Sequence, residues 1–282
     1  MHGTRRPVAP TASSSLVRSA IRATFNAAAP HFDAEPLFFW DTVGRRTVEL
    51  AGLVRGSRVL DVCCGTGASA LPAAVAVGPT GSVVALDLAD RLLARGRAKA
   101  RALKLDNVEF VPGDMEALQL PDACVDVVLC VLGLYYAQDP PRALAELWRV
   151  LRPEGTLAVT VWGERSLEPG QTLFLRSVAD ERPEFDTRAT TPASRLGDRG
   201  ALTEAFQRAG VQDPTILQET LVHPCTPDDF WTIVLGSGYR ISLDAMGPDS
   251  ASRVRSTLRT RMERADVHEV TSDVMYAKVR KN

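Results

Sequence analysis

The chain has 282 residues, of which 45% are hydrophobic and 24% are charged, and its formal net charge is −1. These values are typical of a globular protein with enough mass for a substantial core. Nucleic acid is a poor candidate partner, because a nearly neutral chain has no overall positive field to hold a polyanion against competing salt.

The five cysteines are odd in number, and two of them are adjacent. They form no CxxC pair, so the sequence signals neither a disulfide framework nor a zinc site. Residues 1–15 are expected to be a disordered leader without an apolar run of signal-peptide length, and nowhere do about 18 apolar residues run together. We therefore expect a reduced, cytoplasmic protein with no bound metal and no stable membrane insertion.

The first expected helices cover residues 16–26 and 36–54, which together form an N-terminal helical cap over residues 16–54. The second helix opens with Pro36 in its first turn. Short runs that are apolar on both sides then alternate with helical stretches, as in a parallel sheet covered on both faces. The expected strands of this region cover residues 57–62, 82–87, 108–111, 125–131 and 155–162. The alternation predicts a Rossmann-like, doubly wound α/β core over residues 55–163.

The regular alternation weakens after Trp162, and residues 164–282 are expected to complete the core sheet. Asp198 and Thr226 are placed to cap helices. Two further strands are expected at residues 214–224 and 270–279, with an insertion of two helices between them at about 227–264. The resulting fold is a mostly parallel seven-stranded sheet, with the N-terminal helices and the insertion forming a lid.

The stretch VLDVCCGTG, residues 59–67, joins the first strand to a helix. Gly65 and Gly67 let the backbone approach a ligand, and the start of the helix offers unpaired N–H groups. Asp61, at the end of the strand, would repel a pyrophosphate but attract an ammonium group. Asp87 ends the next strand, where a carboxylate can accept ribose hydroxyls. With Asp114 after the third strand, these features suit S-adenosylmethionine better than NAD.

At this point the sequence resembles the class I S-adenosylmethionine-dependent methyltransferases. The branch is the one that includes the ubiquinone and menaquinone biosynthesis C-methyltransferases (type 11) and many bacterial small-molecule methyltransferases. The motifs that carry the resemblance are VLDVCCGTG, VVALDLADRLLARGRAKA, VEFVPGDMEALQLPDACVDVVLC and ALAELWRVLRPEGTLAVTVWG. The stretch ATFNAAAPHFD resembles the helix that closes over the cofactor.

The resemblance implies roles for individual residues. Asp61 and the glycine turn would hold the methionine end of the cofactor, Asp87 the ribose, and Asp114 the adenine edge. The full set of cofactor-binding residues that it implies is Phe32, Asp61, Cys63, Gly65, Gly67, Asp87, Leu88, Gly113, Asp114, Met115, Cys130, Val131 and Tyr135. The candidates for a catalytic role near the methyl group are His31, Tyr135 and Tyr136.

Two positions depart from the family pattern: Cys63 stands where many relatives have glycine, and Val125 where an aromatic residue often precedes the aspartate. Cys63 and Cys64 could be a redox pair, although small packing residues are the commoner role of adjacent cysteines at a strand end. Asp126 is expected to order the start of its strand rather than to react.

The predicted function is methyl transfer from S-adenosylmethionine to a small organic acceptor on oxygen or carbon, such as a quinone precursor or a secondary metabolite. Aromatic residues in the expected lid, among them Trp40 and Trp162, suit an apolar acceptor. Two alternatives stay open: an NAD-linked oxidoreductase, and a catalytically silent methyltransferase-like partner subunit. A homodimer is compatible with the methyltransferase and with both alternatives.

Overall fold

The computed structural model describes residues 12–184 and 193–282. Most of the expected leader lies outside these residues. Its last part, from Ala12, was wrongly assigned, because it is the first turn of helix α1 (Ala12–Ala28). Alanine at this start favours the helix, and α1 packs on helices α4 and α10.

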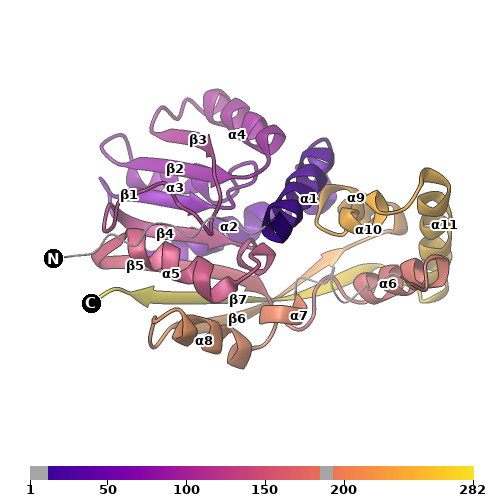
Figure 1. Ribbon diagram of the computed structural model, residues 1–282. Helices are drawn as coiled ribbons and strands as arrows, with labels where there is room; N and C mark the ends of the chain where they lie inside the picture. The colour runs from indigo at the N-terminus through magenta and orange to yellow at the C-terminus, as the bar shows by residue number, and fades with distance from the viewer. Residues whose placement is uncertain (1–11, 185–192) are drawn as a thin grey trace.

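A seven-stranded sheet with the order β3-β2-β1-β4-β5-β7-β6 runs through the molecule (Figure 1). Only β7 is antiparallel, and it pairs with both β5 and β6. The strands are β1 (Arg58–Val62), β2 (Ser82–Asp87), β3 (Val108–Pro112), β4 (Val125–Val131), β5 (Leu151–Trp162), β6 (Thr215–Pro224) and β7 (Glu269–Arg280). The predicted Rossmann-like sheet is confirmed.

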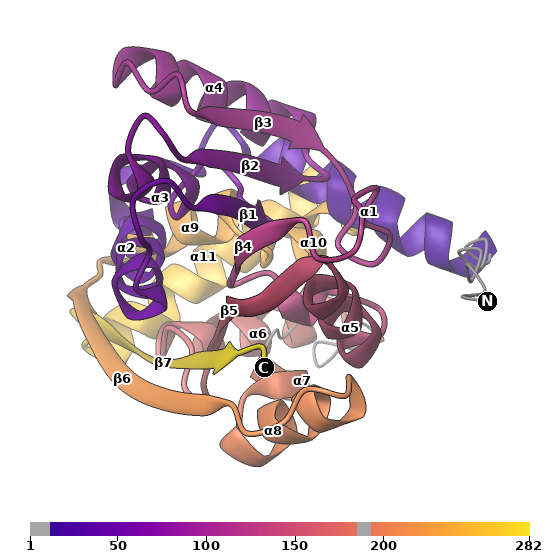
Figure 2. The ribbon, with the colours of Figure 1, turned by 90° about the vertical axis from the view of Figure 1, so that its left-hand side faces the viewer.

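Helices cover both faces of the central strands, with α2 and α3 on one side and α5 on the other (Figure 2). The strands between them are buried, because both of their faces meet helices. These helices are α2 (Phe39–Ala51), α3 (Ala70–Val77), α4 (Asp90–Ala102) and α5 (Pro140–Val150), with short 3-10 helices η1 (Glu35–Leu37) and η2 (Leu134–Tyr136). The predicted second helix is therefore divided at Phe38.

The second half of the chain adds helices α6 (Gly170–Glu181), α7 (Ala193–Leu196), α8 (Arg199–Arg208), α9 (Pro227–Gly236), α10 (Arg240–Asp244) and α11 (Pro248–Arg264). The predicted caps are confirmed: Asp198 accepts from the Ala201 N–H, and Thr226 forms a capping box with Asp229. The expected two-helix insertion is wrong by one element, because α10 lies between α9 and α11. Helix α6 was also missed, in a stretch that showed little pattern.

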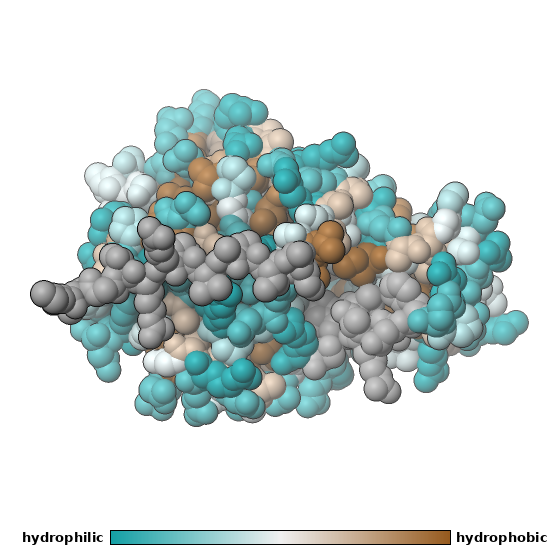
Figure 3. Space-filling model, viewed as in Figure 1, coloured by the Kyte–Doolittle hydropathy of each residue, from teal (hydrophilic) through white to brown (hydrophobic). Residues whose placement is uncertain are grey.

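Helices α1, α9, α10 and α11 lie together at one end of the sheet (Figure 1). This is the end at which the parallel strands finish, since Val62 of β1 pairs with Leu86 of β2 and with Cys130 of β4. The space-filling view shows a mostly hydrophilic face with smaller hydrophobic areas (Figure 3). No helix within the described residues is both long and apolar enough to cross a membrane.

Candidate cofactor and acceptor site

The turn after β1 has a left-handed backbone at three positions. Cys63, Gly65 and Gly67 have φ values of 60°, 55° and 95°. A Cβ on Gly67 would also lie 2.9 Å from Leu71, so glycine is required there on two grounds. The left-handed conformation explains why glycine is common at the position of Cys63, where a side chain costs about 1–2 kcal/mol.

Asp87 ends β2 and fixes this turn. Its Oδ2 accepts from the Gly65 N–H at 2.9 Å, and its Oδ1 accepts from the Ala89 N–H at 2.8 Å. Burial raises the pKa of Asp87, and hydrogen bonds from Ala89, Gly65 and Leu88 N–H groups oppose that shift. The carboxylate therefore joins the glycine turn to the start of α4.

Asp61 is completely buried at the end of β1. Its Oδ2 accepts from the Ser69 hydroxyl at 2.7 Å, whereas its Oδ1 has no hydrogen-bond partner among the described residues. Burial raises the pKa of Asp61 to about 7, and the charge of Asp87 adds to the shift. A buried acceptor without a donor is costly, so this oxygen suits a cationic group brought to the turn.

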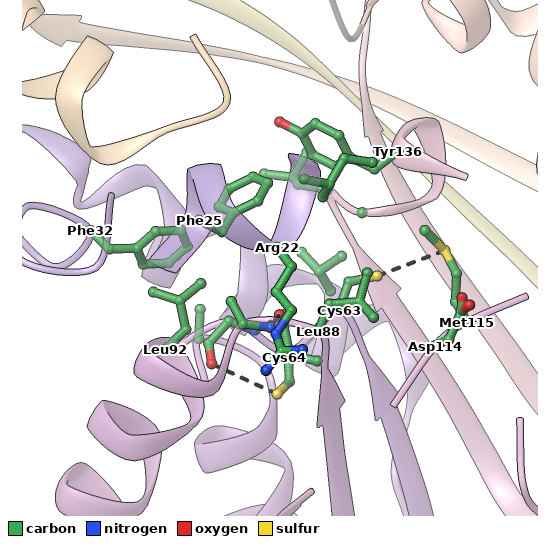
Figure 4. A pocket seen from close by; sticks show the side chains of 18 of the residues that line it. Arg22, Phe25, Phe32, Cys63, Cys64, Leu88, Leu92, Asp114, Met115 and Tyr136 are labelled. Atoms are coloured by element: carbon green, nitrogen blue, oxygen red, sulfur yellow. Dashed lines mark hydrogen bonds between the residues drawn. The ribbon is translucent and has the colours of Figure 1, made fainter. Parts of the chain in front are cut away.

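A cavity opens beside the turn, with about 920 Å³ of empty space that includes its opening to solvent. Its walls come from α1, the turn, and the residues that follow β2, β3 and β4, as Figure 4 shows. Phe25 and Tyr136 lie on one side of it and Cys64 lies on the opposite side, while Phe32 and Leu92 pack together at one end. Met115 approaches Cys63 with a sulfur to sulfur distance of 3.7 Å. The cavity combines apolar walls with acids at the strand ends.

Helix α1 covers this cavity and is tied to its rim by two ion pairs. Arg18 binds Asp114, and Arg22 binds Asp90. The Arg18 pair is about one-fifth exposed, whereas the Arg22 pair is about half exposed. The Asp114 carboxylate thus serves as an anchor for α1 in this structure.

The segment after α1 is fastened to the same turn through Asp33. This carboxylate accepts hydrogen bonds from Thr66, Arg95 and Lys99, at 2.5, 2.9 and 2.5 Å. Burial would raise the pKa of Asp33, but the hydrogen bonds from Lys99 and Thr66 hold it below its ordinary value. Thr66 lies between the two glycines of the turn, so the network connects α4, the turn and the covering segment.

A second, smaller cavity adjoins the first, with about 310 Å³ of empty space that includes its opening to solvent. Trp40 and Tyr136 line both, so their rings form the partition between them. The remaining lining residues are Phe39, Tyr135, Trp162, Ser166, Leu167, Ser237, Gly238 and Tyr239. Burial raises the pKa values of Tyr135, Tyr136 and Tyr239. These phenols therefore remain protonated at neutral pH.

The structure gathers most of the sequence-predicted residues around the first cavity. The residues that line it are Phe32, Cys63, Gly65, Asp87, Leu88, Asp114, Met115, Val131 and Tyr136. Tyr135 lines the second cavity instead. The predicted residues that line neither are His31, Asp61, Gly67, Gly113 and Cys130. Asp61 still reaches the wall through Ser69, which does line the first cavity.

Several lining residues were not singled out from the sequence. Those on α1 are Arg18, Ile21, Arg22 and Phe25, whose i, i+3, i+4, i+7 spacing places them on one helix face and could have identified them. The others are Ala68, Ser69, Ala89, Leu92, Glu116, Leu132 and Gly133, whereas Trp40 was expected only in the lid and Cys64 only as a packing or redox residue. Most of these come from segments that only the fold brings to the cavity.

The comparisons with known proteins agree with this geometry. Residues 59–155 match a family model described as a methyltransferase domain. The chain is 39% identical over 114 residues to the demethylmenaquinone methyltransferase of Listeria welshimeri. This alignment covers 40% of this chain and 48% of that protein. Over 131 residues, the chain is 37% identical to the ubiquinone/menaquinone biosynthesis C-methyltransferase UbiE of Pasteurella multocida, 46% of this chain and 49% of that protein.

The core, residues 59–155, is therefore similar to known methyltransferase domains.

Solved structures share the fold over most of the chain. A Bacillus halodurans protein proposed to be a methyltransferase matches with a TM-score of 0.57 at 18% identity, over 85% of this chain and 99% of that one. The [4+2]-cyclase SpnF matches with a TM-score of 0.56 at 22% identity, over 98% of this chain and 97% of that one. At these identities the likeness concerns the fold alone. The alignments span about half the length of the curated relatives.

Proposed function

We propose that the protein transfers a methyl group from S-adenosylmethionine to a small, mainly apolar organic acceptor. The observation that carries the proposal is the pair of adjoining cavities: one bears the glycine turn and strand-end acids, the other is aromatic, and both share Trp40 and Tyr136. The curated relatives are named for quinone biosynthesis. A quinone-like precursor or a secondary metabolite, methylated on carbon or oxygen, is the acceptor class that we propose.

The residues around the first cavity fit the cofactor. Asp87 would accept the ribose hydroxyls, while Leu88 and Met115 would contact the adenine, with Asp114 at its edge. Asp61 lies behind the cavity wall, where its carboxylate with the unpaired Oδ1 would favour the cationic amino group of the methionine end by charge. When bound, S-adenosylmethionine supplies an electrophilic methyl group on a sulfonium sulfur.

The protein contributes alignment and the exclusion of water. In-line transfer needs the acceptor atom at about 3 Å from the methyl carbon, and such positioning can supply roughly 7–11 kcal/mol. Helix α1 closes the first cavity, and the rings of Trp40 and Tyr136 define where the two ligands meet. An electron pair of the acceptor, a lone pair on oxygen or the π pair at a carbon, would form the new bond to the methyl carbon, and the electrons of the broken sulfur–carbon bond would stay on sulfur.

A proton on the acceptor must leave by a route other than the tyrosines of the second cavity. Their raised pKa values keep them protonated, so they serve as hydrogen-bond donors rather than bases. His31 lines neither cavity. We therefore propose positioning roles for Tyr135 and Tyr136 in place of proton abstraction.

The reduced state of the cysteines supports a cytoplasmic setting as part of the proposal. All five cysteines are free. Cys63 and Cys64 are adjacent without a bond, and burial contributes to raising the pKa values of both thiols. A thiol with a raised pKa is a weak nucleophile at neutral pH, which argues for packing rather than redox chemistry.

The experiment that tests the proposal is calorimetric titration with S-adenosylhomocysteine, with NADH as the control ligand. Micromolar binding of the first and none of the second is expected. Transfer of labelled methyl from S-adenosylmethionine to a panel of phenols, quinols and enones then tests catalysis. Tight cofactor binding with no transfer to any acceptor would favour the silent partner subunit, and NADH binding would favour the oxidoreductase.

A further inference from the structure

The second cavity has a chemical character of its own. Its walls are five aromatic side chains from α2, η2 and the end of β5, together with Tyr239 from the insertion. Among the described residues that line it, none is charged. An anion would lose its hydration there without gaining a partner, which is costly, and the lining holds no carboxylate to balance a cation. The cavity therefore suits an uncharged, flat ligand whose faces meet aromatic rings.

Trp40 carries an unused hydrogen-bond donor at this cavity. Its indole Nε1 is buried and has no partner among the described residues. Buried tryptophan N–H groups normally find an acceptor, and leaving one unpaired costs about 1–3 kcal/mol. Because Trp40 lines both cavities, the unpaired group belongs to a ring at the partition between them.

The Trp40 ring is held rigidly. It stacks on Phe32 at 5.3 Å between centroids with an interplanar angle of 7°, and it contacts Phe39 at 4.6 Å and Trp162 at 6.3 Å. A ring clamped by three others cannot turn its N–H toward a distant acceptor without losing these contacts. The missing partner must therefore come to Trp40.

Two other polar side chains at the cavity are already engaged. The Tyr239 hydroxyl donates to Gln171 Oε1, and the Ser237 hydroxyl accepts from the Tyr239 N–H at 3.4 Å. Hydroxyls can act as donor or acceptor, whereas an indole N–H only donates. The complementary atom on a ligand is thus an oxygen or nitrogen lone pair.

We propose that the second cavity binds an uncharged planar arene bearing a carbonyl or ether-type oxygen, and that Trp40 Nε1–H donates a hydrogen bond to that oxygen. This assignment rests on the proposed function, since the ligand is the methyl acceptor of the same site. The hydrogen bond fixes the acceptor at the partition, next to the methyl group.

The test compares two ligands of nearly the same shape, 1-tetralone and tetralin, which differ by one carbonyl oxygen. Each is titrated calorimetrically into the full chain in the presence of saturating S-adenosylhomocysteine. The wild-type protein is expected to bind 1-tetralone about tenfold more tightly, the effect of one hydrogen bond of about 1.4 kcal/mol. Trp40→Phe should remove that preference. Trp148→Phe is the matched control, because Trp148 packs beneath Lys281 away from both cavities.

A second measurement needs no variant of Trp40. The indole 15N–1H signal of Trp40 in the wild-type protein should move downfield with 1-tetralone and not with tetralin. Equal binding of the two ligands, binding of neither, or a tenfold preference that survives in Trp40→Phe would overturn the assignment. Failure of S-adenosylhomocysteine to bind would instead contradict the proposed function, and the two ligands would then be compared without it.

Discussion

Asp87 has both a structural and a ligand-binding role in this site. Its two oxygens already accept the Gly65 and Ala89 N–H groups, and the carboxylate also lines the first cavity. Asp87→Ala is expected to weaken S-adenosylhomocysteine binding tenfold or more, because hydrogen bonds to a charged group are lost. Calorimetry on the variant measures this.

The matched control for that prediction is Asp126→Ala. Asp126 lies near the start of β4, accepts from the Arg58 N–H at 2.7 Å and pairs with Arg152, as the sequence suggested. Its loss should lower stability without changing cofactor affinity. Equal losses of affinity in the two variants would contradict a ribose-binding role for Asp87.

Asp61 makes stability depend on pH. Its folded-state pKa of about 7 lies above the ordinary value of 3.8, so the folded protein holds this proton more tightly than the unfolded chain. The stability from this group is therefore full below about pH 4 and is lost as pH rises to 7, with a ceiling of about 4 kcal/mol. Asp61→Asn cannot ionise, so its stability should gain relative to wild type as pH rises. Urea unfolding at pH 5 and pH 8 would show this, and parallel pH profiles would refute it.

At the level of elements, helix α1 depends on its ion pairs to cover the cavity. Arg18→Ala removes the less exposed pair with Asp114, and Arg22→Ala removes the half-exposed pair with Asp90. We expect faster release of S-adenosylhomocysteine in Arg18→Ala, about three- to tenfold, and a smaller change in Arg22→Ala, since exposed pairs contribute little. Stopped-flow displacement would measure both, and a larger effect at Arg22 would argue against the anchor.

The elements that the sequence predicted well are those whose burial leaves a simple pattern. The first five strands are apolar on both sides, and their expected limits agree with β1 to β4 to within one residue. Strand β5 begins four residues earlier than expected, because Leu151 pairs with Val125 across a register irregularity. Helix α6 was missed because its apolar positions follow no clear amphipathic stripe, and tertiary packing on α11 stabilises it.

The residues of the site divide in the same way, into those that the strand pattern predicts and those that it does not. Gly65, Asp87 and Asp114 follow strands directly, so strand order alone places them at one edge. Trp40, Trp162 and Gly238 come together only because α2, β5 and the insertion meet in space. The sequence predicted Trp40 and Trp162 in an aromatic lid, but no local spacing joins residues this far apart, so it could not show that they enclose one cavity with Gly238.

Across the whole molecule, the insertion reaches the core at Gly238. A Cβ there would lie 2.0 Å from the Tyr136 hydroxyl oxygen, so the tyrosine ring is seated against the glycine. On its other side, Phe25 of α1 meets the same ring edge-on, with centroids 5.2 Å apart. Tyr136 is thus held between the two covering segments while it forms part of the partition.

This arrangement predicts that Gly238→Ala, a change in the insertion, disturbs the acceptor cavity. The added methyl group must displace Tyr136, whose ring would then lose its contact with an occupant of the second cavity. We expect 1-tetralone to bind at least threefold more weakly, with a smaller change for S-adenosylhomocysteine, because the glycine turn is untouched. Gly247→Ala is the control in the same insertion, since a Cβ there meets nothing within 4 Å. Unchanged binding of 1-tetralone in Gly238→Ala would mean that the insertion covers the core without shaping the acceptor cavity.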